Sequence, residues 1–139
     1  DGRWKPFFES VAQAYRENSA VRDAMEGERN LQGFLKAYLA LASYYLVEPE
    51  LEMNYGYCDF FLLPDKKRYP DVKHSYILEL KYATRTATDA ELEVQALEGR
   101  KQLLRYSEDK IVRCLSEGTT LHRLLLQFRG WDLVRCEEV

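Results

Sequence analysis

The chain has 139 residues, of which 46% are hydrophobic, 13% aromatic and 31% charged, and its formal net charge is -3. This composition is typical of a folded domain that can bury a core without disulfides or a structural metal. It excludes a disordered chain, and no apolar run is long enough to cross a membrane. We therefore expect a single domain, 1–139, that does not associate with a membrane.

The net charge bears on nucleic acid, because affinity for a phosphate backbone usually comes from a positive surface. The overall balance of -3 argues mildly against such a partner. A cluster of carboxylates that holds a metal adds negative charge to the sequence, however, and basic residues can still gather locally. The candidates for a local patch are Lys66, Lys67, Arg68, Arg85, Arg100, Lys101, Arg105, Lys110 and Arg113.

Cysteines and the first residues indicate a cellular context. Cys58, Cys114 and Cys136 lie in apolar stretches without paired metal-ligand spacing, so we expect reduced core thiols in a cytoplasmic protein. The start at Asp1-Gly2 has neither a methionine nor a signal-peptide pattern. We expect a domain taken from a longer chain, with an upstream domain before it.

The first half of the chain predicts helices and then a strand. Residues 4–24 have mixed helical spacing, which indicates one or two short helices. From Glu28 to Leu46 apolar residues recur at intervals of three and four, which predicts a buried helix that ends before Pro49. The alternating stretch from Leu51 to Tyr55 predicts a first strand before a turn at Gly56.

The last third predicts a long helix and two strands. Thr86 to Asp89 has the composition of an N-cap region, and we expect a helix from Ala90 to Leu115 with Gly118 just past its end. Leu121 to Phe128 and Trp131 to Cys136 then predict two strands around Arg129-Gly130. The expected order is helix, three strands, helix, two strands.

The candidate functional residues are charged side chains inside two strand-like, otherwise apolar stretches, Tyr57 to Leu63 and Tyr76 to Tyr82. Placing charge in such surroundings costs free energy, so a role or a partner is expected. Alternation puts Glu79 and Lys81 on one face of their strand and Leu78 and Leu80 on the other. If the strands pair as a hairpin across residues 64–70, Asp59 sits beside Glu79, and the two carboxylates share a gap that a metal ion fits.

This order of elements, together with Glu28, Asp59 and the Glu79-Leu80-Lys81 motif, resembles the PD-(D/E)XK nuclease superfamily. Gly56 to Asp59, Tyr76 to Tyr82 and Gln102 to Tyr106 are similar to the nuclease-like domain at the C-terminus of bacterial AAA-ATPase-like proteins. The resemblance implies an α/β fold with a restriction-endonuclease-like core, a mixed central β-sheet flanked by helices. It also implies metal-dependent cleavage of nucleic acid, most simply DNA, and an ATPase domain in the same chain.

The resemblance also assigns roles to the residues. Asp59 and Glu79 match the metal-binding acids, Lys81 the motif lysine, Glu28 the acid of the first core helix and Gln102 the polar residue of the following helix. The expected metal is Mg²⁺, which Mn²⁺ can replace. Mg²⁺ prefers oxygen ligands, and the backbone carbonyl of Leu80 is a further candidate ligand.

Each residue has a structural alternative. A Glu-Leu-Lys triplet also occurs on the solvated face of an edge strand, and Asp59 could form an ion pair with Lys81. Glu28 could interact with the helix dipole, and Gln102 shares with Gln95, Gly99 and Tyr106 a helical stripe that faces either the site or the edge of the core. His74 and His122 lie far apart in sequence without ligand spacing, so we assign them no role.

Two other functions remain open. The fold could be a catalytically silent module that binds nucleic acid or protein and regulates an attached ATPase, which the charge of -3 favours modestly. It could also be a protein-interaction domain, which would expose an apolar patch. An oligomer is compatible with either function.

Overall fold

A computed structural model describes residues 4–17, 28–40, 45–53, 56–64, 67–68 and 70–139. Side chains are described for all of these except residues 28–30, 40, 45–53 and 56–59. None of the helices in the described part is both long and apolar enough to cross a membrane. The elements are α1 (Lys5–Glu17), α3 (Glu28–Ala40), β1 (Tyr45–Met53), β2 (Gly56–Pro64), β3 (His74–Ala83), α4 (Asp89–Ser107), α5 (Lys110–Leu115), β4 (Thr120–Arg129) and β5 (Asp132–Glu138).

The described strands form one five-stranded sheet in the order β1-β2-β3-β4-β5. β3 and β4 are parallel, and every other neighbouring pair is antiparallel. The parallel pair requires a crossover, which α4 and α5 supply. The predicted α/β class, the mixed sheet and the hairpin of β2 with β3 are therefore confirmed.

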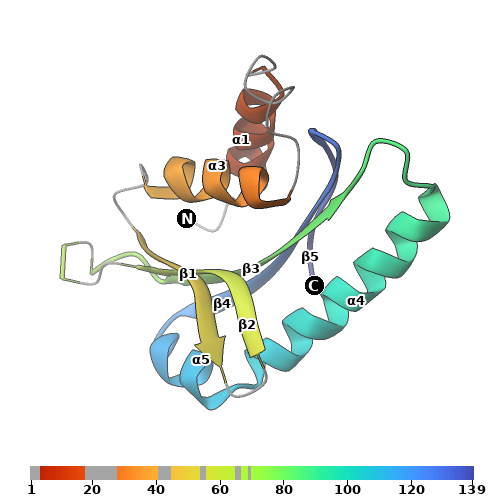
Figure 1. The fold of residues 1–139 in the computed structure, drawn as a ribbon. Helices are drawn as coiled ribbons and strands as arrows, with labels where there is room; N and C mark the ends of the chain where they lie inside the picture. The colour runs from red at the N-terminus through yellow and green to blue at the C-terminus, as the bar shows by residue number, and fades with distance from the viewer. Residues whose placement is uncertain (1–3, 18–27, 41–44, 54–55, 65–66, 69) are drawn as a thin grey trace.

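Helices cover both faces of the sheet, and each face has its own core (Figure 1). α1 and α3 pack on one face, where Phe8, Leu31 and Leu35 contact β-strand residues such as Leu78. α4 and α5 pack on the other face, where Leu103 and its neighbours meet Phe61, Ile77 and Leu125. Since alternate residues of β3 enter different cores, the strand is buried on both sides.

The predicted helix from Glu28 to Leu46 is too long at its C-terminal end. Its described part ends at Ala40, and Tyr45 and Leu46 already belong to β1. The predicted strand from Leu51 therefore begins earlier, and Pro49 lies within it rather than marking the end of a helix. β1 is an edge strand of the sheet, where a residue without a backbone N–H is tolerated.

The predicted helix from Ala90 to Leu115 is in fact two helices. α4 begins at the expected place, where Thr88 and Glu91 form a capping box with hydrogen bonds of 3.2 Å in each direction. α4 ends at Ser107, and the Asp109 carboxylate accepts a hydrogen bond of 2.9 Å from the Ile111 N–H to begin α5. An aspartate at the N-cap of a new helix can end the preceding helix, even where the sequence has neither glycine nor proline at the break.

The expectation of buried core thiols is wrong for one cysteine. Cys114 is exposed on α5, because Val112 is the residue that this short helix buries. Cys136 on β5 is partly buried, and burial raises the pKa of its thiol to about 11. Both are free thiols, as predicted, and the side chain of Cys58 lies outside the described residues.

Alanine substitution at two helical glycines is expected to change stability in opposite directions. A Cβ at Gly99 of α4 would lie 2.6 Å from Leu125 Cδ1, which is fully buried, whereas a Cβ at Gly33 of α3 would meet nothing within 4 Å. We expect Gly99→Ala to lower the free energy of unfolding by about 1–2 kcal/mol through overpacking. Gly33→Ala should raise it by about 0.5–1 kcal/mol through helix propensity. Urea denaturation of both variants measures this, and a stabilised Gly99→Ala protein would contradict the close packing of α4 on Leu125 of β4.

Candidate active site

The central strand β3 places Glu79 and Lys81 together on the face that α4 covers. Glu79 is only 4% exposed, although it carries an ionisable carboxyl group. Lys81 Nζ lies 3.3 Å from Glu79 Oε1, and the lysine side chain keeps 18% of its surface exposed. Leu78 and Leu80 enter the core on the other face. The predicted alternation is correct, and the Glu-Leu-Lys motif occupies the middle of the sheet rather than a solvated edge.

Asp59 directly precedes the residues of β2 that pair with β3. Phe60 pairs with Leu78 in the antiparallel ladder of β2 and β3. The Asp59 side chain lies outside the described residues, as does that of Glu28, the first residue of α3.

α4 covers the Glu79-Leu80-Lys81 motif. The side of the helix that faces the sheet carries the stripe noted in the sequence, Gln95, Gly99, Gln102 and Tyr106. Gln95 Nε2 donates a hydrogen bond of 2.8 Å to the Tyr82 carbonyl. A Cβ added at Gly99 would lie 3.5 Å from Lys81 Cε. Tyr106 is buried in the α4 core. In Gln102, Oε1 is buried and makes no hydrogen bond within the described part of the chain.

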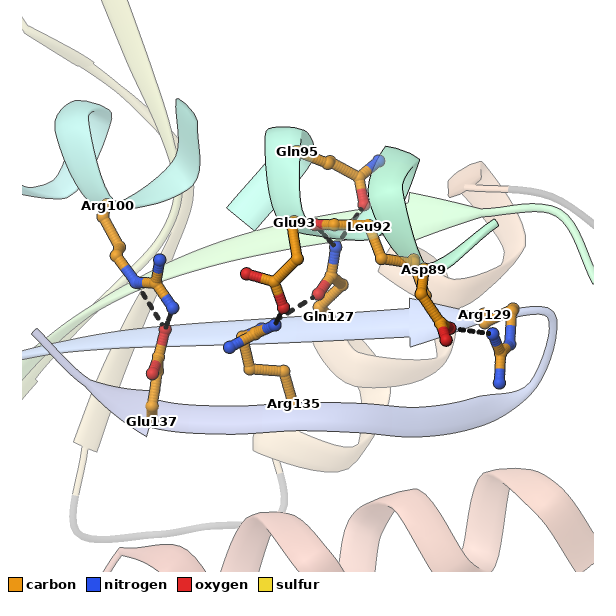
Figure 2. Close-up of polar contacts among 9 residues, drawn as sticks. All are labelled: Asp89, Leu92, Glu93, Gln95, Arg100, Gln127, Arg129, Arg135 and Glu137. Carbon is orange, nitrogen blue, oxygen red and sulfur yellow. Dashed lines mark hydrogen bonds and ion pairs between the residues drawn. The ribbon is translucent and has the colours of Figure 1, made fainter. Parts of the chain in front are cut away.

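A polar row runs from Lys81 across the next two strands. Lys81 pairs with Gln127 of β4, and Gln127 pairs with Arg135 of β5. The Gln127 amide donates hydrogen bonds of 2.8 Å to the Leu92 carbonyl and to Gln95 Oε1, and it accepts one of 3.1 Å from Arg135 Nε (Figure 2). Sequence analysis missed Gln127, although an amide inside the apolar run from Leu124 to Phe128 was a signal.

A family profile of the PD-(D/E)XK nuclease superfamily matches residues 26–138, which are most of the chain. The chain belongs to the PD-(D/E)XK nuclease superfamily. No curated protein and no solved structure matches it. The predicted superfamily is therefore confirmed, and the matched range spans the positions of Glu28, Asp59, Glu79, Lys81 and Gln102. The narrower resemblance to the nuclease-like domain of bacterial AAA-ATPase-like proteins stays a prediction.

Nucleases of this superfamily typically use divalent metals, so the donor set must be compared with that requirement. Among described side chains, no group of three or more His, Cys, Asp or Glu residues could hold a metal ion. The described donors that fit are the buried Glu79 carboxylate and the buried Gln102 amide oxygen. Both are hard oxygen ligands of the kind that Mg²⁺ prefers.

Other charged residues near α4 form ion pairs at its borders. Arg100 lies 2.8 Å from Glu137, Arg129 lies 3.2 Å from Asp89, and Arg135 pairs with Glu93 (Figure 2). A surface cavity of about 290 Å³ lies among them, with lining residues Asp89, Leu92, Glu93, Gln127, Arg129, Val134 and Arg135. Its two arginines are matched by two carboxylates, so this nuclease-fold domain has no excess positive charge there.

Two of the predicted basic-patch residues have other contacts. The Arg85 guanidinium stacks 4.2 Å from the centre of the Trp131 ring, and Arg100 pairs with Glu137. The Arg85 contact fixes the loop after β3 to the turn before β5, and the Arg100 contact fixes α4 to β5. Glu137 therefore offsets the charge of Arg100, whereas Arg85 keeps its positive charge on the Trp131 ring.

The two histidines are far apart in sequence but form a hydrogen-bonded pair, a contact that their spacing did not predict. His74 Nδ1 and His122 Nε2 are 2.8 Å apart, and His122 Nδ1 is 2.7 Å from Glu138 Oε1. The His122 ring also stacks on Tyr76. Parallel pairing of β3 with β4 brings residues 48 positions apart into contact. This cluster lies on the α1 and α3 face, away from Glu79, because Tyr76 belongs to that core.

This pair predicts a pH dependence of stability. Burial, and secondarily His122, lower the pKa of His74 below its ordinary value of 6.5. The unfolded chain therefore binds a proton at His74 more readily than the folded one, and stability should fall as the pH drops through about 6.5. His74→Asn, which keeps a donor but does not titrate, should flatten this part of the curve. Urea denaturation from pH 8 to about pH 5 measures it, and equal slopes for both proteins would contradict the prediction.

Proposed function

We propose that this domain is a metal-dependent nuclease that hydrolyses phosphodiester bonds of nucleic acid, and that its substrate is DNA. The observation that carries the proposal is the buried Glu79 carboxylate, paired with the partly exposed Lys81, in the middle of the sheet of a PD-(D/E)XK superfamily member. A buried charged pair often costs more free energy than well-packed apolar residues would. Stability alone therefore gives little reason for placing these charges in the central strand.

Asp59 and Glu79 are the proposed metal ligands. Phe60 pairs with Leu78, and the same register continued by one residue would put Asp59 opposite Glu79, which supports this assignment. Strand alternation supports a shared face, since Phe61, two residues after Asp59, packs in the α4 core. The Leu80 carbonyl is a further proposed ligand, and Mg²⁺, or Mn²⁺ in its place, would neutralise phosphate charge and lower the pKa of a water.

Lys81 is the proposed catalytic cation. Its ammonium is in contact with the Glu79 carboxylate and partly exposed, so it can approach both the acids and a substrate phosphate. In that position it stabilises the negative charge that develops on phosphate oxygens during attack by water. An ammonium that remains protonated serves this purpose better than it serves as a general base.

Gln102 and Glu28 complete the proposed set with unequal support. Gln95 Nε2 bonds the Tyr82 carbonyl, and a Cβ added at Gly99 would lie 3.5 Å from Lys81 Cε, so α4 runs back along β3. The next turn, which carries Gln102, therefore approaches the level of Glu79, where its buried amide oxygen could orient a water or a ligand. Glu28 has less support, because the apolar side of α3 packs on the face opposite to Glu79.

A second candidate function is a silent module that binds nucleic acid or protein and regulates an attached ATPase. It is favoured by the ion pair itself, since Lys81 already neutralises Glu79 without a metal. An ATPase domain in the same chain and a cytoplasmic location belong to both candidates. These two features rest on the resemblance and on the sequence pattern.

Cleavage of single- and double-stranded DNA in Mg²⁺ tests the first candidate against the second. We expect hydrolysis by the wild-type domain and none by Asp59→Ala, with DNA binding retained in the variant. A silent module would bind DNA with an affinity that falls with salt and would never cleave it. A wild-type domain that neither binds nor cleaves DNA would contradict the proposal.

A further inference from the structure

The helix α4 has apolar side chains on two opposite sides. One side is buried against the sheet through Leu92, Ala96, Gly99, Leu103 and Tyr106. The other side presents Val94, Leu97 and Leu104, which are 62%, 50% and 47% exposed. Together with the exposed Lys101, these residues follow the three- and four-residue spacing of a helix that packs on another helix. We call Val94, Leu97, Lys101 and Leu104 the outer stripe.

The charges beside the outer stripe are divided along the helix. Exposed Glu91 lies in the first half of α4 and exposed Glu98 at its middle, whereas exposed Lys101 and Arg105 lie in the second half. A parallel copy of the helix would put like charges side by side. An antiparallel copy puts the acidic half against the basic half and also opposes the two helix dipoles. The surface is therefore complementary to itself.

We propose that the chain forms a twofold symmetric dimer in which the outer stripes of two α4 helices pack antiparallel. Val94 then lies level with Leu104 of the second copy, and Leu97 packs on the methylene chain of its Lys101. With a rise of about 1.5 Å per residue, the same alignment leaves Glu91 about 3 Å along the axis from Arg105 of the second copy. This inference does not depend on nuclease activity.

The same alignment identifies one unfavourable contact. Glu98 lies near the twofold axis, where it comes close to Glu98 of the second copy. Like charges at such a position oppose association, so their removal should strengthen the dimer. One helix pair is also smaller than the standard interface of a tight complex, so we expect a dissociation constant on the order of 10 µM.

Sedimentation velocity over about a hundredfold range of micromolar concentrations tests the dimer. We expect Leu97→Glu and Leu104→Glu each to weaken it by at least about tenfold, and Glu98→Gln to strengthen it by about threefold. Val134→Glu changes an exposed apolar residue of β5 outside the stripe and should leave the dimer unchanged. Circular dichroism checks that each variant is folded.

Two results would overturn the proposal. One is a wild-type protein that stays monomeric over the whole range. The other is a dimer that Leu97→Glu and Leu104→Glu do not weaken, or that Glu98→Gln weakens. Glu98→Gln tests the dimer even where the charged substitutions disturb the helix, because it preserves side-chain volume and is expected to increase association.

Discussion

Glu79→Gln is expected to reduce the DNA cleavage rate in Mg²⁺ by about a thousandfold or more and to leave the fold intact. Glutamine has nearly the same volume as glutamate, so the packing of this buried side chain between β3 and α4 is kept. The charge is lost, and with it the carboxylate that we propose as a metal ligand. Cleavage under single-turnover conditions, with the same amount of folded protein, measures the effect.

The matched control for this variant is Glu137→Gln. Glu137 also pairs with a basic side chain, Arg100, at 2.8 Å, but it lies on β5 at the border of α4. We expect its removal to change cleavage by less than about threefold, as for a surface ion pair without a catalytic role. Equal losses in both variants would point to a general effect on the fold, and full activity of Glu79→Gln would refute its proposed role.

Lys81→Met is expected to lower the free energy of unfolding by about 3 kcal/mol at neutral pH. Methionine retains most of the aliphatic contact with the Gly99 backbone region but removes the ammonium 3.3 Å from Glu79 Oε1. A buried carboxylate then loses its ion pair, which is costly because water cannot replace the lost charge. The partial exposure of the lysine keeps the expected loss at the lower end for buried pairs. Urea denaturation measures it.

Two further variants identify the cause of this loss. Arg100→Met breaks the half-exposed pair with Glu137 and should cost less than about 1 kcal/mol. The double variant Glu79→Gln/Lys81→Met removes both charges and should be more stable than Lys81→Met alone. If Lys81→Met is no more costly than Arg100→Met, the pair is not the buried interaction that we describe.

The sequence could predict the candidate site where local alternation decides the geometry. In β3, the pattern around Glu79 and Lys81 has a period of two, and burial of Leu78 and Leu80 on the opposite face follows from it. The pairing of β2 with β3 was also predictable, because the connection between them is short. Family resemblance then supplied roles for these residues that periodicity alone could not supply.

Element boundaries were less predictable where two signals compete. Tyr45 continues the helical spacing of the preceding residues, yet it belongs to β1, because pairing with Pro64 of β2 outweighs local periodicity. The break between α4 and α5 has no glycine or proline, and only the capping carboxylate of Asp109 marks it. In both cases tertiary structure or a single side chain outweighed a regular pattern.

Contacts that depend on sheet topology could not be predicted from spacing. His74 and His122 are distant in sequence, and their contact follows from the parallel register of β3 and β4. Likewise, the hydrogen bond of Gln127 with Gln95 requires that α4 cross back over β4, and its hydrogen bond with Arg135 follows from the pairing of β4 with β5. A sequence pattern shows which face a residue occupies, but not which strand becomes its neighbour.

The central claim, that Asp59 and Glu79 hold a divalent metal beside Lys81, is tested most directly by anomalous diffraction from crystals soaked in Mn²⁺. The proposed site predicts one anomalous peak at about 2–2.5 Å from a carboxylate oxygen of each acid, which disappears in Glu79→Gln crystals. A Mn²⁺ ion bound elsewhere on the domain, or an undisturbed Glu79-Lys81 ion pair at saturating Mn²⁺, would contradict it.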